Sequence, residues 1–232
     1  MMPIVVLCGG TSTRLQPLTA KKPKSMVTVL GKPFIDHQLT LMQENDVKKV
    51  ILCIGKFGDQ IRDYVGNGKK WGMSVKYSDD GEQLLGTGGA LKNAYDMLPE
   101  EFIVMNGDSY LDIYYNPIVQ KFIESKKPLL MTVYPVLDGS YKNVHVRYGK
   151  IIDYDKTGKN PDLNCIDYGF TPMKKWLLKH IPDGIFDFSV IYSNAIALKD
   201  AACYKSPKVF HEMGSYEGLE ETTQYIKFRG KL

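Results

Sequence analysis

Glycine, hydroxyl and arginine residues follow an apolar run near the start of the chain, in the stretch LCGGTSTRL (7–15). Glycines let a backbone approach an anion closely and expose its N–H groups, and Arg14 adds a planar cation suited to phosphate oxygens. The pattern therefore fits a phosphate-binding loop. It also fits a tight strand-to-helix turn with a surface arginine, because neither G-x-x-x-x-G-K-[ST] nor G-x-G-x-x-G is present.

Two further segments offer partners for the same anion. Lys24 lies in KKPKSMV (21–27), where Pro23 disfavours helix and predicts an extended segment. The glycine-rich loop GEQLLGTGGAL (81–91) precedes a predicted helix, whose N-terminus favours negative charge. Taken separately, these segments fit a solvated basic loop and a flexible connection. Two glycine loops after two predicted strands favour a shared ligand.

Two carboxylates lie at the ends of predicted strands, Asp108 in MNGDSYLD (105–112) and Glu212 in FHEMG (210–214). Mg²⁺ prefers oxygen ligands and typically takes one or two protein carboxylates together with substrate phosphates. We therefore expect Asp108 to hold Mg²⁺ and Glu212 to supply a second ligand. From spacing alone, a simple turn and a surface glutamate are the alternatives.

These residues must be positioned by elements that alternate between strand and helix in the first half of the chain. Short apolar runs predict strands over 3–7, 48–55, 74–79 and 101–108. Helical spacing of apolar residues predicts helices over 34–45, 59–68 and 88–98. Such alternation predicts a Rossmann-like, mostly parallel sheet with helices on both faces, in which ligands bind beyond the carboxyl ends of the strands.

The second half of the chain has a more mixed pattern. It predicts a strand over 128–136, a hairpin over 143–156 that turns at 148–150, a strand over 165–173, helices over 174–180 and 188–199, a strand over 207–214 and a helix over 215–228. We predict one α/β domain over 1–232, consisting of a nucleotide-binding half (1–112) and a mixed C-terminal lobe (113–232).

Composition excludes several other classes. The net charge of +4 is small and the basic residues are spread along the chain, so we expect no nucleic-acid partner. None of the four cysteines forms a C-x-x-C pair, which favours a reducing compartment. The first predicted strand begins at once and no apolar run approaches the roughly 18 residues of a membrane span. We therefore expect a cytoplasmic protein with neither a signal peptide nor a membrane partner.

The combined motifs resemble those of the sugar-1-phosphate nucleotidyltransferases, also called nucleoside-diphosphate-sugar pyrophosphorylases. CGGTSTRLQPLT (8–19) resembles the family signature G-G-x-x-T-R-L with its following P-L-T. Residues 22–39 resemble P-K-[PS]-[ML]…G-[KQ]-P-[LFI], residues 84–91 resemble L-G-T-[GA]-G-A, and MNGD resembles the strand-ending G-D. GKPFIDHQL, LGTGGALKNA and IDYG are most similar to the D-glycero-D-manno-heptose 1-phosphate guanylyltransferase branch.

This resemblance implies a GT-A-like fold that uses Mg²⁺ to transfer a nucleotidyl group from an NTP to a sugar 1-phosphate. The products would be an NDP-sugar and pyrophosphate. The branch implies GTP and a heptose or mannose-type 1-phosphate, for surface polysaccharide synthesis. The family roles fall on Arg14, Lys24 and Asp108 for catalysis; Leu7, Gly9, Gly10, Thr13, Arg14, Gln83, Gly86 and Gly88 for the nucleotide; Lys156, Asp167 and Gly169 for the sugar phosphate; and Asp108 and Glu212 for the metal.

The sequence departs from the family pattern at three positions. Ser12 stands where many members carry glycine, so its side chain must point away from the phosphates or the loop must shift. Glu212 replaces a common aspartate, and its extra methylene moves the carboxylate. Tyr216 replaces a common proline.

Three alternatives stay open. The base could be cytosine, uracil or thymine, with another sugar 1-phosphate as acceptor. A dinucleotide-dependent oxidoreductase would need G-x-G-x-x-G and an acidic residue after the second strand, where CIGK (53–56) stands instead. A non-catalytic nucleotide-binding regulatory subunit is the third alternative. The residues also leave open whether the chain forms a homo-oligomer.

Overall fold

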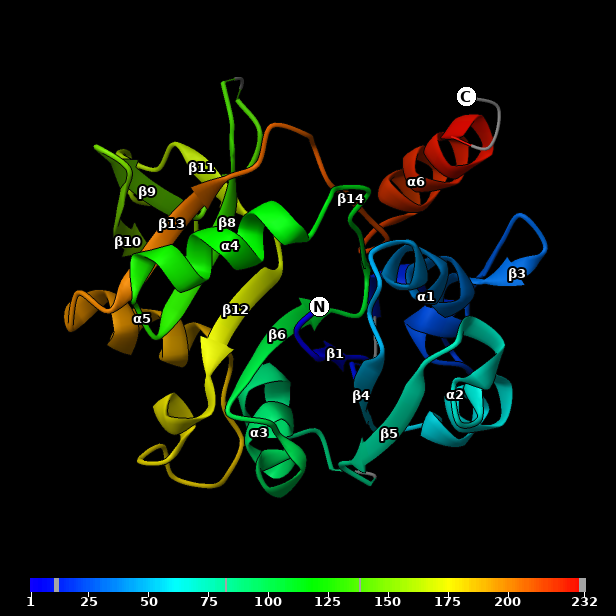
Figure 1. The fold of residues 1–232 in the computed structure, drawn as a ribbon. Helices are drawn as coiled ribbons and strands as arrows, with labels where there is room; N and C mark the ends of the chain where they lie inside the picture. The colour runs from blue at the N-terminus through cyan, green and yellow to red at the C-terminus, as the bar shows by residue number, and fades with distance from the viewer. Residues whose placement is uncertain (11–12, 82, 138, 230–232) are drawn as a thin grey trace.

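The first half of the chain forms a parallel sheet with a helix after each strand. This computed structural model describes residues 1–10, 13–81, 83–137 and 139–229 (Figure 1). The parallel strands are β1 (Ile4–Leu7), β4 (Lys49–Ile54), β5 (Ser74–Asp79) and β6 (Glu101–Asn106), in the spatial order β6-β1-β4-β5. The helices between them are α1 (Phe34–Glu44), α2 (Gly58–Val65) and α3 (Gly86–Asn93). A small ribbon of β2 (Thr28–Val29) and β3 (Lys32–Pro33) precedes α1.

The second half extends the same sheet. The added strands are β8 (Leu129–Pro135), β9 (Val144–Arg147), β10 (Lys150–Tyr154), β11 (Cys165–Asp167), β12 (Phe170–Lys174) and β13 (Ala201–Lys205). Strand β12 lies between β6 and β8 and runs antiparallel to both, whereas β13 runs parallel to β8. The predicted mostly parallel sheet with helices on both faces is therefore confirmed, and it becomes mixed where β12 joins the two halves.

Two predicted strands differ from the structure. The strand predicted over 165–173 is divided into β11 and β12, because Gly169 has a φ of +67° and shifts the register against β8. The strand predicted over 207–214 is reduced to β14 (His211–Glu212), which pairs outside the large sheet with β7 (Ser109–Tyr110). The helix predicted over 174–180 is a single 3-10 turn, Lys175–Leu178.

The sequence analysis did not predict one helix and one strand of the large sheet, nor the two-residue strands β2, β3 and β7. Helix α4 (Asn116–Ser125) has Pro117 in its first turn and buries Ile118 and Phe122, four residues apart, which is a readable helical signal. Strand β13 is short and half-buried, so it has no clear alternation. Helices α5 (Ser189–Ala197) and α6 (Tyr216–Arg229) lie close to their predicted positions. Among the described helices, none is both long and apolar enough to cross a membrane.

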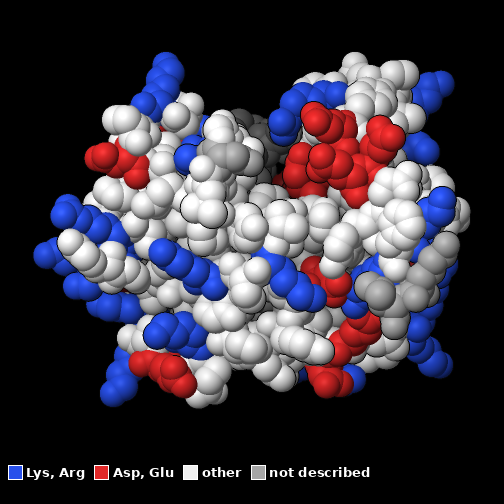
Figure 2. Space-filling model, turned by 90° about the horizontal axis from the view of Figure 1, so that it is seen from above, with Lys and Arg blue, Asp and Glu red and all other residues white. Residues whose placement is uncertain are grey.

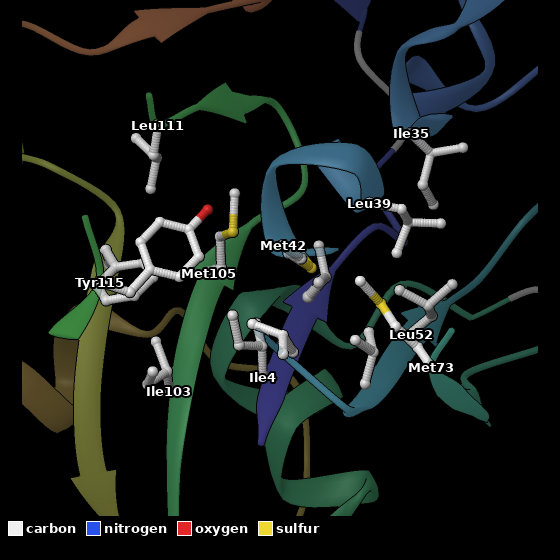
Figure 3. Packing of buried hydrophobic residues seen from close by; sticks show 14 of the residues in the cluster. Ile4, Ile35, Leu39, Met42, Leu52, Met73, Ile103, Met105, Leu111 and Tyr115 are labelled. Atoms are coloured by element: carbon white, nitrogen blue, oxygen red, sulfur yellow. The ribbon is translucent and has the colours of Figure 1, made fainter. Parts of the chain in front are cut away.

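The core has one layer on each face of the sheet. Ile4 and Val6 of β1 face a cluster that includes residues of α1, α2 and α4, whereas Val5 faces the cluster that includes α3 and α5. This follows from the alternation of side chains along a strand. In Figure 3, Leu39 and Met42 of α1 lie over Ile4 and Leu52. Helix α6 lies on the side of α1, away from the β9–β10 hairpin (Figure 1).

Candidate active site

The site lies where β1 and β6 end side by side. β1 has β4 on one side and β6 on the other, so the topology switches direction here, the usual ligand position in an open α/β sheet. The N–H of Gly107 donates to the carbonyl of Leu7 at 3.1 Å. A Cβ at Gly107 would lie 2.5 Å from that oxygen. The close contact of the two strand ends therefore requires glycine.

A cavity of about 810 Å³ opens at these strand ends and takes residues from both halves of the chain. The predicted site residues that line it are Leu7, Gly10, Arg14, Lys24 and Asp108 from the first half and Lys156, Asp167, Gly169 and Glu212 from the second. Seen from above, the surface is hollowed between two masses of side chains, with basic side chains at the rim and a group of acidic side chains beside it (Figure 2).

The first cluster in the cavity contains two cations and two carboxylates. Arg14 and Lys24 each lie in a short 3-10 turn, Thr13–Leu15 and Lys24–Met26. The Nζ of Lys24 lies 2.8 Å from Oδ2 of Asp108. Backbone pairing brings Glu212 alongside, because β14 pairs with β7 and the N–H of Met213 donates to the carbonyl of Asp108 at 2.9 Å.

The charges in this cluster act on one another. Burial and the nearby Asp108 carboxylate raise the pKa of Glu212, while the N–H of Gly214 and the cations of Lys24 and Arg14 oppose that rise. Asp108 and Glu212 line the same cavity and offer hard oxygen donors to a divalent cation. In the described part of the chain, no group of three or more His, Cys, Asp or Glu forms a metal site. Two carboxylates plus substrate phosphates are nevertheless a common set of ligands for Mg²⁺.

A second cluster is formed around Lys156. Its Nζ lies 2.6 Å from Oδ2 of Asp187, and Oδ1 of Asp187 accepts the N–H of Ser189 at 3.0 Å. Burial favours the neutral acid, but the hydrogen bonds from Lys156 and Ser189 prevail and lower the pKa of Asp187 to about 2. Asp187 is therefore a fixed anion that orients Lys156. Sequence reasoning missed it, since it lies in no motif and only precedes a predicted helix.

Asp167 lies at the end of β11 in the same cavity. Its Oδ1 accepts the N–H of Gly169 at 3.0 Å and the hydroxyl of Tyr192 at 3.3 Å. Burial raises the pKa of Asp167 to about 6, against those two hydrogen bonds and the charge of Lys156. Its environment thus disfavours charge, in contrast to that of Asp187.

The second glycine loop packs against protein rather than lining the cavity. The N–H groups of Gly88 and Gly89 donate to the carbonyl of Phe186 at 3.0 and 3.1 Å. A Cβ would lie 2.5 Å from that oxygen at Gly86 and 2.4 Å from the Phe186 ring at Gly88. The lining residue here is Thr87, which the sequence did not single out. Five predicted nucleotide-binding residues are not among the described residues that line the cavity: Gly9, Thr13, Gln83, Gly86 and Gly88.

Two of the sequence departures have different outcomes. The hydroxyl of Tyr216 donates to the carbonyl of Gln16 at 2.9 Å and so connects the start of α6 to the segment that follows Arg14. The prediction about Ser12 lies outside the described residues.

The fold and the position of the site define a class of protein that comparison identifies directly. Residues 4–158 match the nucleotidyl transferase family, and the chain belongs to that family. The fold is also that of HddC from Yersinia pseudotuberculosis, solved as a complex with GMP-PN. That structure has a TM-score of 0.79 at 24% identity, and the match covers 97% of this chain and 100% of that one.

The proteins similar to this chain in sequence include guanylyltransferases, two of which are described here. The D-glycero-alpha-D-manno-heptose 1-phosphate guanylyltransferase of Aneurinibacillus thermoaerophilus is 29% identical over 70% of this chain and 71% of its own length. The mannose-1-phosphate guanylyltransferase catalytic subunit beta of Drosophila melanogaster is 29% identical over 93% of this chain and 55% of its own. The matches span about half the length of several such relatives.

Proposed function

We propose that this chain transfers a nucleotidyl group from an NTP to a sugar 1-phosphate, giving an NDP-sugar and pyrophosphate. The observation that carries the proposal is that Arg14, Lys24 and two carboxylates line the same cavity as Lys156 and Asp167. One group of charges suits a triphosphate, and the other suits a phosphorylated, hydroxyl-rich acceptor.

The chemistry needs positioning more than a general base. A sugar 1-phosphate is already largely dianionic at neutral pH, because its second pKa is about 6. One of its oxygens forms a new bond to the α-phosphorus, and the bond to the β-phosphate oxygen breaks, which releases pyrophosphate. The protein must hold attacking and leaving oxygens in line and neutralise crowded charge.

The cations divide this task between them. Arg14 would bind the leaving phosphates through its planar fork, and Lys24 would exchange its ion pair with Asp108 for the α-phosphate and the incoming phosphate. Lys156 would bind the sugar phosphate and leave Asp187. If Mg²⁺ is bound, Asp108 and Glu212 would hold it, and it would neutralise charge on the triphosphate.

GTP with a heptose or mannose-type 1-phosphate is the pair we propose. The two guanylyltransferase relatives described above support this choice through their names, and the HddC complex supports a guanine nucleotide. The product would serve surface polysaccharide synthesis, and the reaction would take place in the cytoplasm. Whether one subunit suffices or a homo-oligomer forms would follow from sedimentation measurements on the active protein.

The activity is tested by pyrophosphate release. The protein is incubated with Mg²⁺, each of GTP, CTP, UTP and dTTP, and a panel of sugar 1-phosphates. We expect release with GTP and mannose 1-phosphate or heptose 1-phosphate above all other pairs. Release only with CTP, UTP or dTTP would overturn the GTP assignment, and release with GTP and only some other sugar 1-phosphate would overturn the acceptor assignment. Absence of release with every pair would overturn the activity, and nucleotide binding without release would favour a regulatory subunit.

Single lysine variants test the division of roles. Lys24→Ala should lower kcat by about 10²–10³, as expected when one preorganised charged contact is lost. Lys156→Ala should mainly raise KM for the sugar 1-phosphate. Lys21→Ala is the matched control, since this exposed lysine lies in the same segment and is not among the described cavity residues. Equal effects of Lys21→Ala and Lys24→Ala would remove Lys24 from the mechanism.

A further inference from the structure

A buried glutamine on α1 contacts the turn that carries Asp108. The side chain of Gln38 is fully buried, and its Nε2 donates to the carbonyl of Ser109 at 2.8 Å and to that of Asn106 at 3.3 Å. A primary amide has two N–H groups, so both are used. The two accepting carbonyls lie on either side of Asp108 in the chain. The amide therefore bridges the turn from Asn106 to Ser109.

The other end of the same amide has no partner. Oε1 of Gln38 is buried and makes no hydrogen bond with any described residue. A buried acceptor without a partner is costly, and an apolar side chain of the same shape would avoid that cost. Packing of α1 on the sheet therefore does not explain a glutamine here. The contacts made by its Nε2 are what the residue provides.

The rest of the turn is held by other elements. The N–H of Gly107 donates to Leu7 of β1, and the carbonyl of Asp108 accepts from Met213, next to Glu212. Three segments distant in sequence thus fix consecutive backbone groups of the turn. Of these contacts, only those from Gln38 come from a side chain, so they alone can be removed by substitution without changing the backbone path elsewhere.

We propose that Gln38 is a positioning residue that holds the Asp108 turn, and with it the Asp108 carboxylate, in the orientation needed toward Lys24, Glu212 and a bound divalent cation. This inference rests on the proposed function. Residues that orient a ligating side chain typically affect metal affinity or activity by about 10- to 100-fold. A shift of that size is expected when both donors of Gln38 are removed.

The variant that tests the proposal is Gln38→Met, which keeps length and apolar volume but removes both N–H groups. Gln38→Leu is a second variant in case one of the two folds poorly. Gln43→Met, on an exposed position of the same helix, is the matched control for the substitution. Leu39→Ala is the control for lost stability, because Leu39 is buried in the core beside Gln38 and makes no side-chain hydrogen bond.

Each variant is characterised by two measurements. Hydrogen exchange reports the amides of 106–110 and 211–213 and needs no turnover. Enzyme assays report the Mg²⁺ concentration for half-maximal rate and the KM of the sugar 1-phosphate. We expect the amides of these two segments to exchange faster in Gln38→Met. The Mg²⁺ concentration for half-maximal rate should rise by about 10-fold or more, with little change in the KM of the sugar 1-phosphate.

The outcomes separate this proposal from the proposed function. Normal exchange and a normal Mg²⁺ requirement in Gln38→Met would overturn the role of Gln38 while leaving the activity intact. Leu39→Ala should lower the melting temperature without raising the Mg²⁺ requirement. If it matches Gln38→Met in both assays, the role is merely structural and the proposal fails. If the wild-type protein has no activity, the proposed function fails. Unchanged hydrogen exchange in Gln38→Met would then still overturn the proposal that Gln38 holds the Asp108 turn.

Discussion

At the scale of single residues, environment separates side chains that look alike in the sequence. Asp167 and Asp187 both line the cavity, yet burial raises the pKa of one to about 6, and hydrogen bonds from Lys156 and Ser189 lower that of the other to about 2. The difference arises because the Lys156 ammonium is in direct contact with Asp187 only. Asp187 binds the Lys156 ammonium. Burial makes the charged form of Asp167 unfavourable, and a hydrogen bond from a sugar hydroxyl would offset that cost.

This cost predicts a pH-dependent stability. The pKa of Asp167 in the folded state lies above its ordinary value of 3.8, so the folded chain binds more protons between pH 4 and 6. The free energy of unfolding therefore falls as pH rises through that window. Above pH 7 the free energy of unfolding is therefore lower than at pH 4 by roughly 2–3 kcal/mol. Asp167→Asn should raise the melting temperature at pH 7.5 and leave it nearly unchanged at pH 4.

Thermal unfolding across pH 4–8 measures this effect. Asp162→Asn is the control, since Asp162 is exposed in the same segment. A stabilisation by Asp167→Asn that is equal at pH 4 and 7.5 would contradict the argument, because it would then not come from the charged form of Asp167.

At the scale of elements, the glycines in the first turn of α3 are explained by packing between the two halves. The segment at Phe186, just before α5, lies so close to Gly86 and Gly88 that a Cβ at either position would clash with Phe186. Thr87, between these two glycines, lines the cavity, and its hydroxyl donates to Oδ2 of Asp187 at 3.2 Å. The glycine pattern predicted contact with the nucleotide at Gly86 and Gly88, but in the structure both glycines pack against Phe186.

A single methyl group in this loop should therefore be destabilising. Gly88→Ala would place a Cβ 2.4 Å from the Phe186 ring and should cost about 1–3 kcal/mol, as overpacking usually does. Gly139→Ala, where a Cβ meets nothing within 4 Å, should be neutral. Phe186→Leu in the Gly88→Ala background should recover part of the loss. The melting temperatures of these variants and of Phe186→Leu alone measure the effect, and additivity of Gly88→Ala and Phe186→Leu would argue against the contact.

At the scale of the whole molecule, the sheet joins the two halves into one unit. Strand β12 pairs with β6 on one side and β8 on the other, and α6 returns to the first half through Arg229, which lies 2.6 Å from Glu44 and 2.9 Å from Asp112. The predicted nucleotide-binding and C-terminal halves thus share backbone hydrogen bonds. Separating the two halves would leave the edges of β6 and β12 without their backbone partners.

We therefore expect the two halves to unfold together. Each half contains one tryptophan, Trp71 and Trp176, so Trp176→Phe and Trp71→Phe leave one fluorescent reporter in each half. Urea titrations of both variants should each give a single transition whose fluorescence and circular dichroism midpoints coincide. Since Trp71 is buried, each fluorescence midpoint is compared with the circular dichroism of the same variant. Separate transitions would indicate two independent domains.

What the sequence by itself determined is largely local. The apolar runs and their turns placed β1, β4, β5, β6 and the helices of the first half, and the ordered motifs predicted the family and the group of Arg14, Lys24 and Asp108. These signals are readable because periodicity and turn chemistry act over a few residues. Helix α4 carried such a signal as well, in Pro117 and its apolar spacing, although it was not predicted.

The tertiary structure alone decided which contacts join segments that are distant in sequence around the candidate site. Asp187, the contact of Phe186 with the glycine loop and the bridge from Gln38 all join segments that are distant in sequence. The short strand β14 exists only because β7 offers it a partner, and that pairing brings Glu212 to Asp108. Such contacts depend on where separate elements pack in space, and no pattern within either segment specifies the other.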